Sequence, residues 1–451
     1  MLPSLSLTCI KFVDELPLDD GQPSGWRRLD RHARRVRILY MEPLRVVISP
    51  NIYLRIHAMH DSPLLPGLNK IYIPDHPSPV DLSPALFLAL GSTLDMVQLH
   101  SYAISDPQFF APFLSSLHVK SPGLTQLALY GVVNAPLKHI YRFTKLQSLE
   151  LKVYNFHLQP QLLQKLGELG HLLDLTIDTG TSSIQPHTTP PPTGHSKFTK
   201  LRKLKILGTV SLINSILSEM EGLPSLTTLE IDELWDGWTN STTENSWRCC
   251  FEVISTFSVV ENIEITPRNQ SVLSASCLFP LFKLDNVISF VINLKDAALS
   301  GSDDDFRLLA GAFPKLKKLV VSEPPSSLLC ESTGRTLACL YHFSQECPDL
   351  REIKICLSSD ASDNLGAINK IPHPIVRNHR HPLEKLDVHS EFGQLEPTQL
   401  IQIARFLDLI FPNLLTSATH SSDTDEVVNW AGIQEFRLAL QDARINAPSV
   451  I

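Results

Sequence analysis

One short pattern recurs along the 451-residue chain and constrains its fold more than any other feature. A turn residue or an aromatic residue, often next to proline, is followed by Leu-x-x-Leu-x-Leu or a close variant, as in residues 198–206 and 223–231. A weaker copy lies at residues 35–38, and the intervals between the clear copies run from 22 to 34 residues. The first apolar residues of the clear copies are Leu68, Leu94, Leu124, Leu146, Leu172, Leu201, Leu226, Val260, Val287, Leu316, Leu350, Leu383 and Leu414.

The geometry of the pattern explains why it uses these residue types. Its last two leucines alternate with polar residues as in a β-strand, so both point into the core. Parallel strands need a return segment, and each interval leaves room for one helix. Helical spacing is seen there, for example in the run Leu162, Leu163, Leu166 and Leu169. The sequence therefore predicts an α/β fold, a leucine-rich-repeat-type solenoid with a curved parallel β-sheet on its concave face and helices on its convex face.

The repeats divide the chain into three parts. Residues 1–30 are expected to form an N-terminal tail or cap, residues 31–415 an irregular solenoid, and residues 416–451 a C-terminal cap or tail. Residues 179–197 are polar and rich in proline and threonine, which predicts a disordered insertion. Residues 360–381 contain several Pro, His and Asn residues, which predicts a second interruption of the array.

Composition narrows the classes of partner. A hydrophobic share of 43% with 19% charged residues is typical of a globular protein, and a net charge of −8 provides no basic surface for nucleic acid. The N-terminus lacks the features of a signal peptide, and no apolar stretch is long enough to span a bilayer. We therefore expect no nucleic-acid or membrane partner and a cytoplasmic or nuclear location.

Cysteine usage gives no sign of metal or redox chemistry. The eight cysteines form no C-x-x-C pair, so a zinc ribbon or a thioredoxin-type site is not indicated. They are expected to be small buried hydrophobic residues in a reducing compartment. Cys249 and Cys250, beside Trp247 in a predicted amphipathic helix, are expected to pack rather than to act as nucleophiles.

No catalytic motif is found, and we expect neither enzymatic activity nor a cofactor. The chain contains no G-x-S-x-G, no P-loop and no G-x-G-x-x-G. Four histidines cluster in one segment, namely His373, His379, His381 and His389. They lack the helical spacing of a metal site, so we expect a solvated loop there rather than a metal site. Tryptophans form another group, which is either an exposed anchor for a partner or a loop packed on itself; they are Trp235, Trp238 and Trp247.

Side chains between the apolar positions of the strands form a ladder on the concave face, where solenoids bind their partners. The candidate protein-binding residues are Tyr72, Gln98, Glu150, Lys203, Lys205, Glu230, Asp232, Glu264, Lys318, Lys354 and Asp387. The alternative is that they merely form the solvated face of the sheet. These residues include both acidic and basic side chains, which argues against a ligand of a single charge sign such as nucleic acid.

Residues 26–37 (WRRLDRHARRVR), residues 64–68 (LLPGL) and the irregular repeats resemble fungal F-box/leucine-rich-repeat-like proteins of the basidiomycete type. Such proteins dock an N-terminal F-box on the Skp adaptor of a ubiquitin ligase and hold the substrate with their repeats. The resemblance implies substrate recognition in ubiquitin-dependent turnover. No F-box precedes Trp26, so we expect the Skp adaptor to bind only if an upstream F-box exists. The alternative function is a scaffold outside any ligase, which binds one protein partner through the concave face.

Overall fold

A computed structural model provides the structure of the chain. It describes residues 31–40, 63–73, 83–100, 104–105, 107–132, 137–154, 160–178, 180, 198–220, 223–234, 244–268, 272–295, 297–323, 334–358, 360–371, 381–389, 395–418 and 424–446. Two compact units make up the chain, unit 1 over Met1–Gly208 and unit 2 over Thr209–Ile451. The predicted tail at residues 1–30 and, apart from Gly180, the predicted insertion at residues 179–197 lie outside the described residues.

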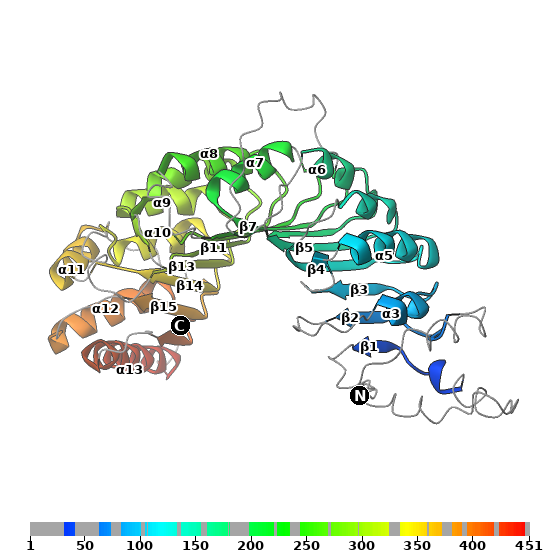
Figure 1. The fold of residues 1–451 in the computed structure, drawn as a ribbon. Coiled ribbons are helices and arrows are strands. Elements are labelled where there is room, and N and C mark those ends of the chain that lie inside the picture. Colours follow the sequence, from blue (N-terminus) through cyan, green and yellow to red (C-terminus); the bar gives the residue numbers. More distant parts are fainter. Residues whose placement is uncertain are drawn as a thin grey trace, which may run out of the picture. The chain divides into compact units, whose positions relative to one another are not determined.

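Unit 1 is built on parallel strands, each paired with the next one in sequence (Figure 1). The strands are β1 (Ile38–Tyr40), β2 (Lys70–Ile73), β3 (Met96–Leu99), β4 (Gln126–Val132), β5 (Ser148–Tyr154), β6 (Asp174–Asp178) and β7 (Lys203–Gly208). The described return segments between β2 and β6 contain the helices α3 (Ser83–Ala89), α5 (Pro107–Lys120), the 3₁₀ helix η2 (Leu137–Arg142) and α6 (Pro160–Gly167).

Unit 2 repeats the same plan. Its parallel strands, in their order in the sheet, are β8 (Thr228–Glu233), β9 (Asn262–Thr266), β11 (Ser289–Asn293), β13 (Lys318–Ser322), β14 (Glu352–Cys356), β15 (Lys385–His389) and β16 (Thr416–Ala418). Its helices are α7 (Val210–Glu219), α8 (Glu244–Ile254), the 3₁₀ helix η3 (Ala275–Lys283), α9 (Asp303–Ala312), α10 (Ala338–Glu346), α11 (Ala361–Lys370), α12 (Pro397–Ile410) and α13 (Thr424–Asn446). A small second sheet pairs β10 (Val272–Ser274) with β12 (Ala298–Ser300).

The predicted repeat is confirmed in both units. All thirteen first apolar residues are at most 1% exposed, and each lies two residues before one of the parallel strands given above. Backbone hydrogen bonds explain this spacing. In one repeat the N–H of Leu124 donates to the carbonyl of Ser121 and closes a turn, and the N–H of Gln126 then donates to the carbonyl of Asp95 in the preceding repeat. The weak copy at residues 35–38 leads into β1.

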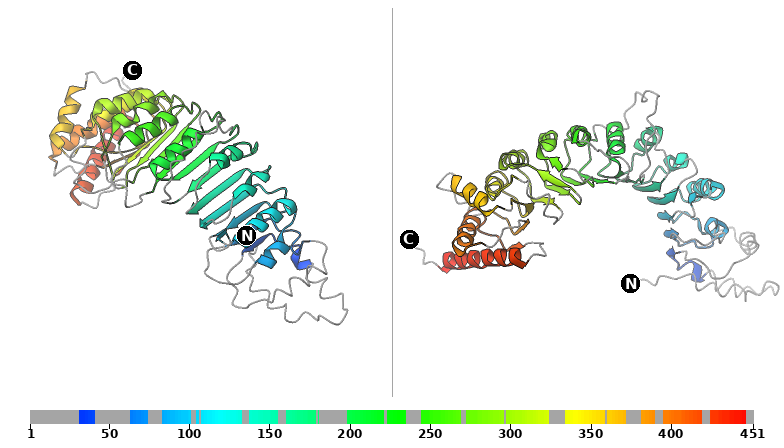
Figure 2. Two further views of the ribbon diagram at one scale, coloured as in Figure 1. Left: turned by 45° about the horizontal axis from the view of Figure 1, so that its top comes forward. Right: turned by 60° about the vertical axis from the view of Figure 1, so that its left-hand side comes forward.

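Alternation along each strand divides the sheet into two faces. On β5, Leu149, Leu151 and Val153 are buried under the helices, whereas Glu150 and Lys152 point to the opposite side. In each unit the described helices that connect one strand to the next lie on one side of the sheet (Figure 2). We call the other side of each sheet its open face; the candidate binding residues belong to this face.

Residues 360–371 do not interrupt the array, so that prediction is wrong there. They form α11, which begins because the side chain of Asp360 accepts a hydrogen bond from Ser362 N–H at 2.8 Å. Asn364 is buried in α11, where its Oδ1 accepts from Leu337 N–H at 2.8 Å and its Nδ2 donates to Asp360 O at 2.8 Å. A largely polar sequence can form a helix here because the buried side-chain amide of Asn364 has hydrogen-bond partners for both its oxygen and its nitrogen.

The C-terminal end of the sheet lies slightly beyond the expected boundary at residue 415. Strand β16 pairs in parallel with β15, which extends the sheet to Ala418. Helix α13 follows and packs against α12 with Trp430 and Ile433 buried. Its buried Arg437 donates to the side chain of Gln434, and Arg444 pairs with Asp408 of α12 at 3.1 Å. The role of residues 416–451 as a cap stays a prediction.

Candidate functional site

The eleven predicted binding residues all lie on parallel strands of their own unit. Unit 1 carries Tyr72, Gln98, Glu150, Lys203 and Lys205, and unit 2 carries Glu230, Asp232, Glu264, Lys318, Lys354 and Asp387. Ten of them are partly or fully exposed. Asp387 is 1% exposed, so its assignment to the exposed ladder is wrong. Its carboxylate is buried beside the ammonium group of Lys354, at 3.5 Å, and pairing of this kind is what makes a buried charge tolerable.

Strand register brings four of the unit 1 residues into one row. Tyr72 faces Gln98, and the row continues through Ala128 to Glu150. Thr176 then connects Glu150 to Lys205. The sequence therefore predicted this row correctly, because residues at the same position of successive repeats become neighbours in a parallel sheet.

Three side chains of β4 and β5 form a closed polar cluster on this face. Glu150 accepts a hydrogen bond from the Tyr130 hydroxyl at 2.5 Å and pairs with the Lys152 ammonium at 2.7 Å. The same ammonium lies 5.0 Å from the centroid of the Tyr130 ring. Sequence reasoning missed Tyr130 and Lys152, although both continue the outward alternation of their strands and face each other in register.

The cluster shifts the pKa values of its members in opposite directions. Burial alone would raise the pKa of Glu150, but hydrogen bonds from Lys152 and Tyr130 and the charges of Lys152 and Lys205 lower it below its ordinary value. The pKa of Tyr130 is raised by burial and by its bond to the Glu150 carboxylate. Tyr130 is thus held as a neutral donor and Glu150 as a carboxylate.

Replacing Lys152 by Met is expected to raise the pKa of Glu150 toward its ordinary value, because the variant removes both a hydrogen bond and a positive charge. A depressed folded-state pKa contributes stability above the ordinary pKa of a glutamate, and this contribution is lost as the pH falls through the folded value. The titration of the Glu150 side-chain carbon by NMR measures the shift.

Lys165→Met serves as the control for this titration, because Lys165 on α6 pairs with Glu168 just after that helix, away from the cluster. It should leave the titration of Glu150 unchanged. An unchanged pKa of Glu150 in the Lys152 variant would contradict the assigned pairing.

Aromatic side chains lie along the open face of unit 1. The rings of Tyr40 and Tyr72 are 6.3 Å apart, and those of His100 and Tyr130 are stacked at 4.5 Å. Gln98, which faces Tyr72 in register, lies between the two pairs and places its Nε2 2.9 Å from His100 Nε2. We call Tyr40, Tyr72, His100 and Tyr130 the aromatic strip; Tyr40 is exposed and the other three are half-exposed.

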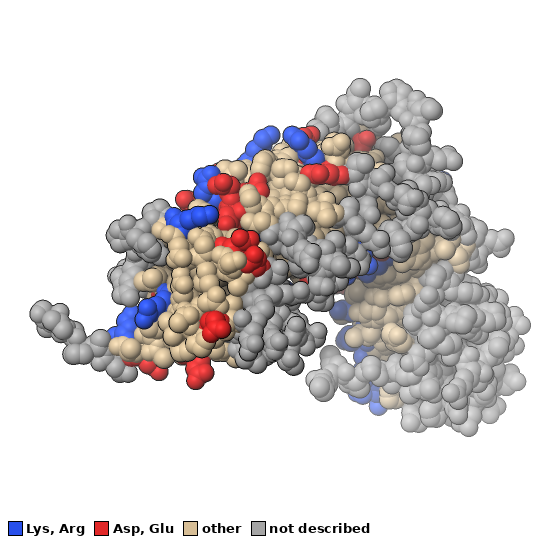
Figure 3. All heavy atoms as spheres, turned by 90° about the vertical axis from the view of Figure 1, so that its left-hand side faces the viewer, with Lys and Arg blue, Asp and Glu red and all other residues tan. Residues whose placement is uncertain are grey.

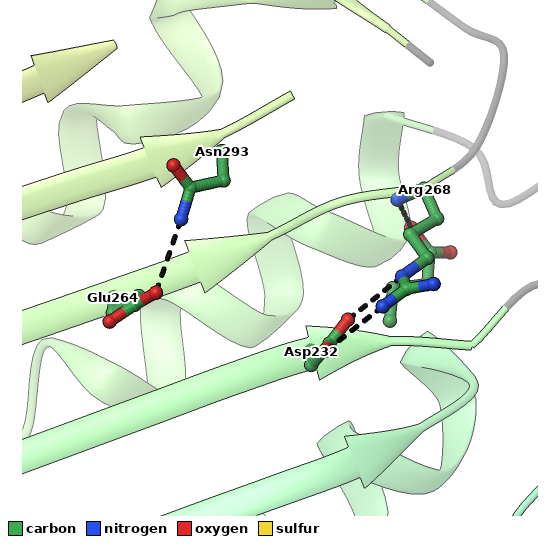
Figure 4. A network of polar contacts seen from close by, with 5 residues as sticks. Asp232, Glu264, Arg268 and Asn293 are labelled. Atoms are coloured by element: carbon green, nitrogen blue, oxygen red, sulfur yellow. Dashed lines mark hydrogen bonds and ion pairs between the residues drawn. The ribbon is translucent and has the colours of Figure 1, made fainter. Parts of the chain in front are cut away.

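Acidic residues begin the open face of unit 2. Arg268 lies just beyond the end of β9. Its guanidinium donates two hydrogen bonds, at 3.0 and 3.2 Å, to the carboxylate of Asp232 on β8 (Figure 4). Glu264 on β9 accepts a hydrogen bond from Asn293 on β11 at 3.1 Å (Figure 4). Register places Glu230 directly opposite Glu264.

Lysines follow on the later strands. Glu352 is shared between Lys318 at 3.3 Å and Lys385 at 3.0 Å. Burial alone would raise the pKa of Glu352, but the two lysines lower it. The side of the molecule drawn in Figure 3 carries acidic and basic residues interspersed with uncharged surface.

The described residues contain no group of three or more side chains that could hold a metal ion. His373 and His379 lie outside them, but His381 is buried rather than solvated, because it packs against Phe411 and both its ring nitrogens are used. Nε2 donates to the carbonyl of Cys347 at 3.0 Å, and Nδ1 accepts from Leu383 N–H at 3.3 Å. The prediction of a solvated loop is therefore wrong at His381.

Most described cysteines are buried, as predicted, and are poor nucleophiles. Burial raises the pKa of Cys347 to about 12, and burial together with Glu244 does the same for Cys277. Cys250 is also buried with a raised pKa, but its neighbour Cys249 is exposed, which corrects the prediction for that residue.

The side chain of Trp247 on α8 is buried, and its ring stacks on that of Phe251 with the centroids 5.5 Å apart. Trp247 is therefore not an exposed anchor for a partner. Trp235 and Trp238 lie outside the described residues. None of the helices in the described segments is long and apolar enough to span a bilayer.

Comparison with solved structures gives distant likenesses to leucine-rich-repeat proteins. No protein-family model matches the chain, and no curated protein matches it. A leucine-rich-repeat protein of Leptospira interrogans is 12% identical with a TM-score of 0.40, over 87% of this chain and 98% of its own. Internalin C2 of Listeria monocytogenes is 15% identical with a TM-score of 0.25, over 53% of this chain and 75% of its own. Neither match supports an F-box or a fungal origin; the leucine-rich-repeat type of fold follows from the strand spacing and register above.

Proposed function

We propose that this chain is a non-catalytic protein-binding repeat protein that holds its partner on the open face of its sheets. The aromatic strip of unit 1 is the observation that supports this most directly. Tyrosine side chains are enriched in protein interfaces, because they bury a large apolar area and keep a polar group for hydrogen bonding.

The strip is also held in place before any partner arrives. Tyr130 is fixed by Glu150 on one side and by the stacked ring of His100 on the other. Tyr72 is held by a contact of its hydroxyl with the Met96 sulfur at 3.4 Å. Side chains that are already ordered lose little conformational entropy on binding, so more of their contact energy appears as affinity.

Site-specific photo-crosslinking tests this function. A benzophenone amino acid at Gln126, an exposed position of β4 beside the strip, should yield discrete protein adducts in an extract of the source cells. The same probe at Gln161, exposed on α6, is the control for the helical side. Tyr72→Ala with Tyr130→Ala should remove the Gln126 adducts, since truncation of the aromatic hot-spot residues of an interface costs about 2 kcal/mol or more each. Equal adducts from both positions would contradict binding by the open face.

The finer form of the proposal is substrate recognition of the F-box/leucine-rich-repeat kind in ubiquitin-dependent turnover, in the cytoplasm or nucleus. The resemblance of residues 26–37 and 64–68 is its support. Co-precipitation with the Skp adaptor tests it, using the 451-residue chain and a chain extended by any F-box encoded upstream. Adducts at Gln126 without adaptor binding by either chain would favour the scaffold alternative.

A further inference from the structure

The open face of unit 2 separates its charges by sign along the strand order. Its first two strands carry the acidic side chains Glu230, Asp232 and Glu264, with Arg268 against Asp232. Glu230 and Glu264 occupy opposite positions of adjacent parallel strands, and Glu264 is exposed. Carboxylates at facing positions of neighbouring strands create a local negative potential that favours a cation above them.

Strand β11 forms a neutral band beside these acids. Its outward residues are Ser289, Val291 and Asn293, and Val291 lies in register with Glu264. An uncharged band with an aliphatic centre suits the apolar part of a bound chain.

Positive charge dominates the exposed side chains beyond this band. The side chains of Lys318 and Lys385 are 44% and 54% exposed, whereas Glu352 between them is 28% exposed. Lys354 adds a further ammonium group on β14, although it is directed toward the buried Asp387. A partner approaching this end of unit 2 therefore meets ammonium groups first.

We propose that this face binds a protein segment of segregated charge, with basic side chains against Glu230 and Glu264 and acidic side chains against Lys318 and Lys385. This deepens the proposed function by stating the chemistry of the partner. Neighbouring strands are about 4.8 Å apart, so β9 lies about 10 Å from β13 and about 19 Å from β15 along the sheet. The two charged ends of the segment should be separated by about 3 to 6 residues if it is extended, or about 7 to 13 if it is helical.

Two fluorescent peptides of identical composition test the inference on the full chain. One has a run of lysines at one end, alternating serine and valine in the middle and a run of glutamates at the other end. The other has the same residues with lysine and glutamate alternating throughout. Fluorescence anisotropy at low ionic strength should show the segregated peptide binding about ten-fold more tightly, and added salt should weaken it. Equal affinities, or no binding of either peptide, would overturn the inference.

Two variants then locate the binding. Glu230→Gln with Glu264→Gln, and separately Lys318→Gln with Lys385→Gln, should each abolish the preference for the segregated peptide. The two double variants alter different strands. If circular dichroism shows that one of them does not fold, the other still tests the inference. Glu252→Gln with Glu435→Gln on the outer sides of α8 and α13 changes the net charge as the acidic pair does, and should leave the preference intact. A preference retained in both face variants would also overturn the inference.

Failure of this inference can be distinguished from failure of the proposed function. A benzophenone amino acid at Val291 reports whether proteins contact this face at all. Adducts at Val291 without a preference for segregated charge would refute the charge pattern and leave the proposed function standing. Absence of adducts at both Val291 and Gln126 would refute the proposed function.

Discussion

Replacing Arg335 by Met is expected to lower the free energy of unfolding by about 3–5 kcal/mol, as is typical when one partner of a buried ion pair is removed. The side chains of Arg335 and Glu323 are 0% and 1% exposed, and Arg335 Nη2 lies 2.8 Å from both carboxylate oxygens. The variant leaves a buried carboxylate held by the Leu299 amide at 2.8 Å. Urea unfolding followed by circular dichroism measures the loss.

Two further variants separate the buried charge from other effects of the substitution. Arg307→Met removes an exposed i,i+3 partner of Asp304 and should change stability by less than about 1 kcal/mol. Arg335→Met combined with Glu323→Met should recover more than half of the loss, because no buried charge remains. Arg335 Nε and Nη1 make no hydrogen bond within the described part of the chain. The native ion pair therefore leaves two donors without acceptors, and replacing both residues removes fewer hydrogen bonds than a fully bonded pair would contribute. A double variant as unstable as the single one would show that the carboxylate is not the source of the cost.

The position of the strands was predictable because one physical rule repeats along the chain. Leu204 and Ile206 on β7 must point the same way, since strand side chains alternate, and both are buried. Each repeat buries its leucines against the next, so irregular spacing between repeats changes the return segments without moving the strands. The start of α9 is likewise local, because Ser302 and Asp305 form a capping box within one helical turn.

Features that depend on contacts between repeats were not predictable. Helix α11 follows a polar sequence, and its buried Asn364 is satisfied by groups as distant as Leu337, 27 residues away. The pair β10–β12 joins short segments whose own sequences carry no repeat pattern. In both cases the stabilising partner belongs to another return segment, which local periodicity cannot reveal.

The candidate site was predictable in part for the same reason. Repetition placed Tyr72 and Glu150 correctly in one row of unit 1. The cluster around Glu150 depends on which strand positions face each other, so Tyr130 and Lys152 emerged only from the register. Asp387 shows the opposite error, since an outward strand position does not guarantee exposure.

Replacing Leu229 by Ala is expected to lower the free energy of unfolding by about 2–5 kcal/mol, because truncation of a buried leucine loses its burial and leaves a cavity. Leu229 on β8 is 0% exposed and lies opposite Ile263 of β9 in the core of unit 2. The spread reflects how far the surrounding side chains can close the cavity. Urea unfolding under the conditions used for the Arg335 variants measures the change.

Glu230→Ala is the matched control for Leu229→Ala, because it truncates the next side chain of the same strand on the open face. Its effect should stay below about 1 kcal/mol, as is usual for a partly exposed charged residue. The two variants share the same backbone environment and differ only in the face that they alter. Similar losses in both would mean that β8 does not separate a buried face from an open one, which would contradict the repeat geometry and the binding surface built on it.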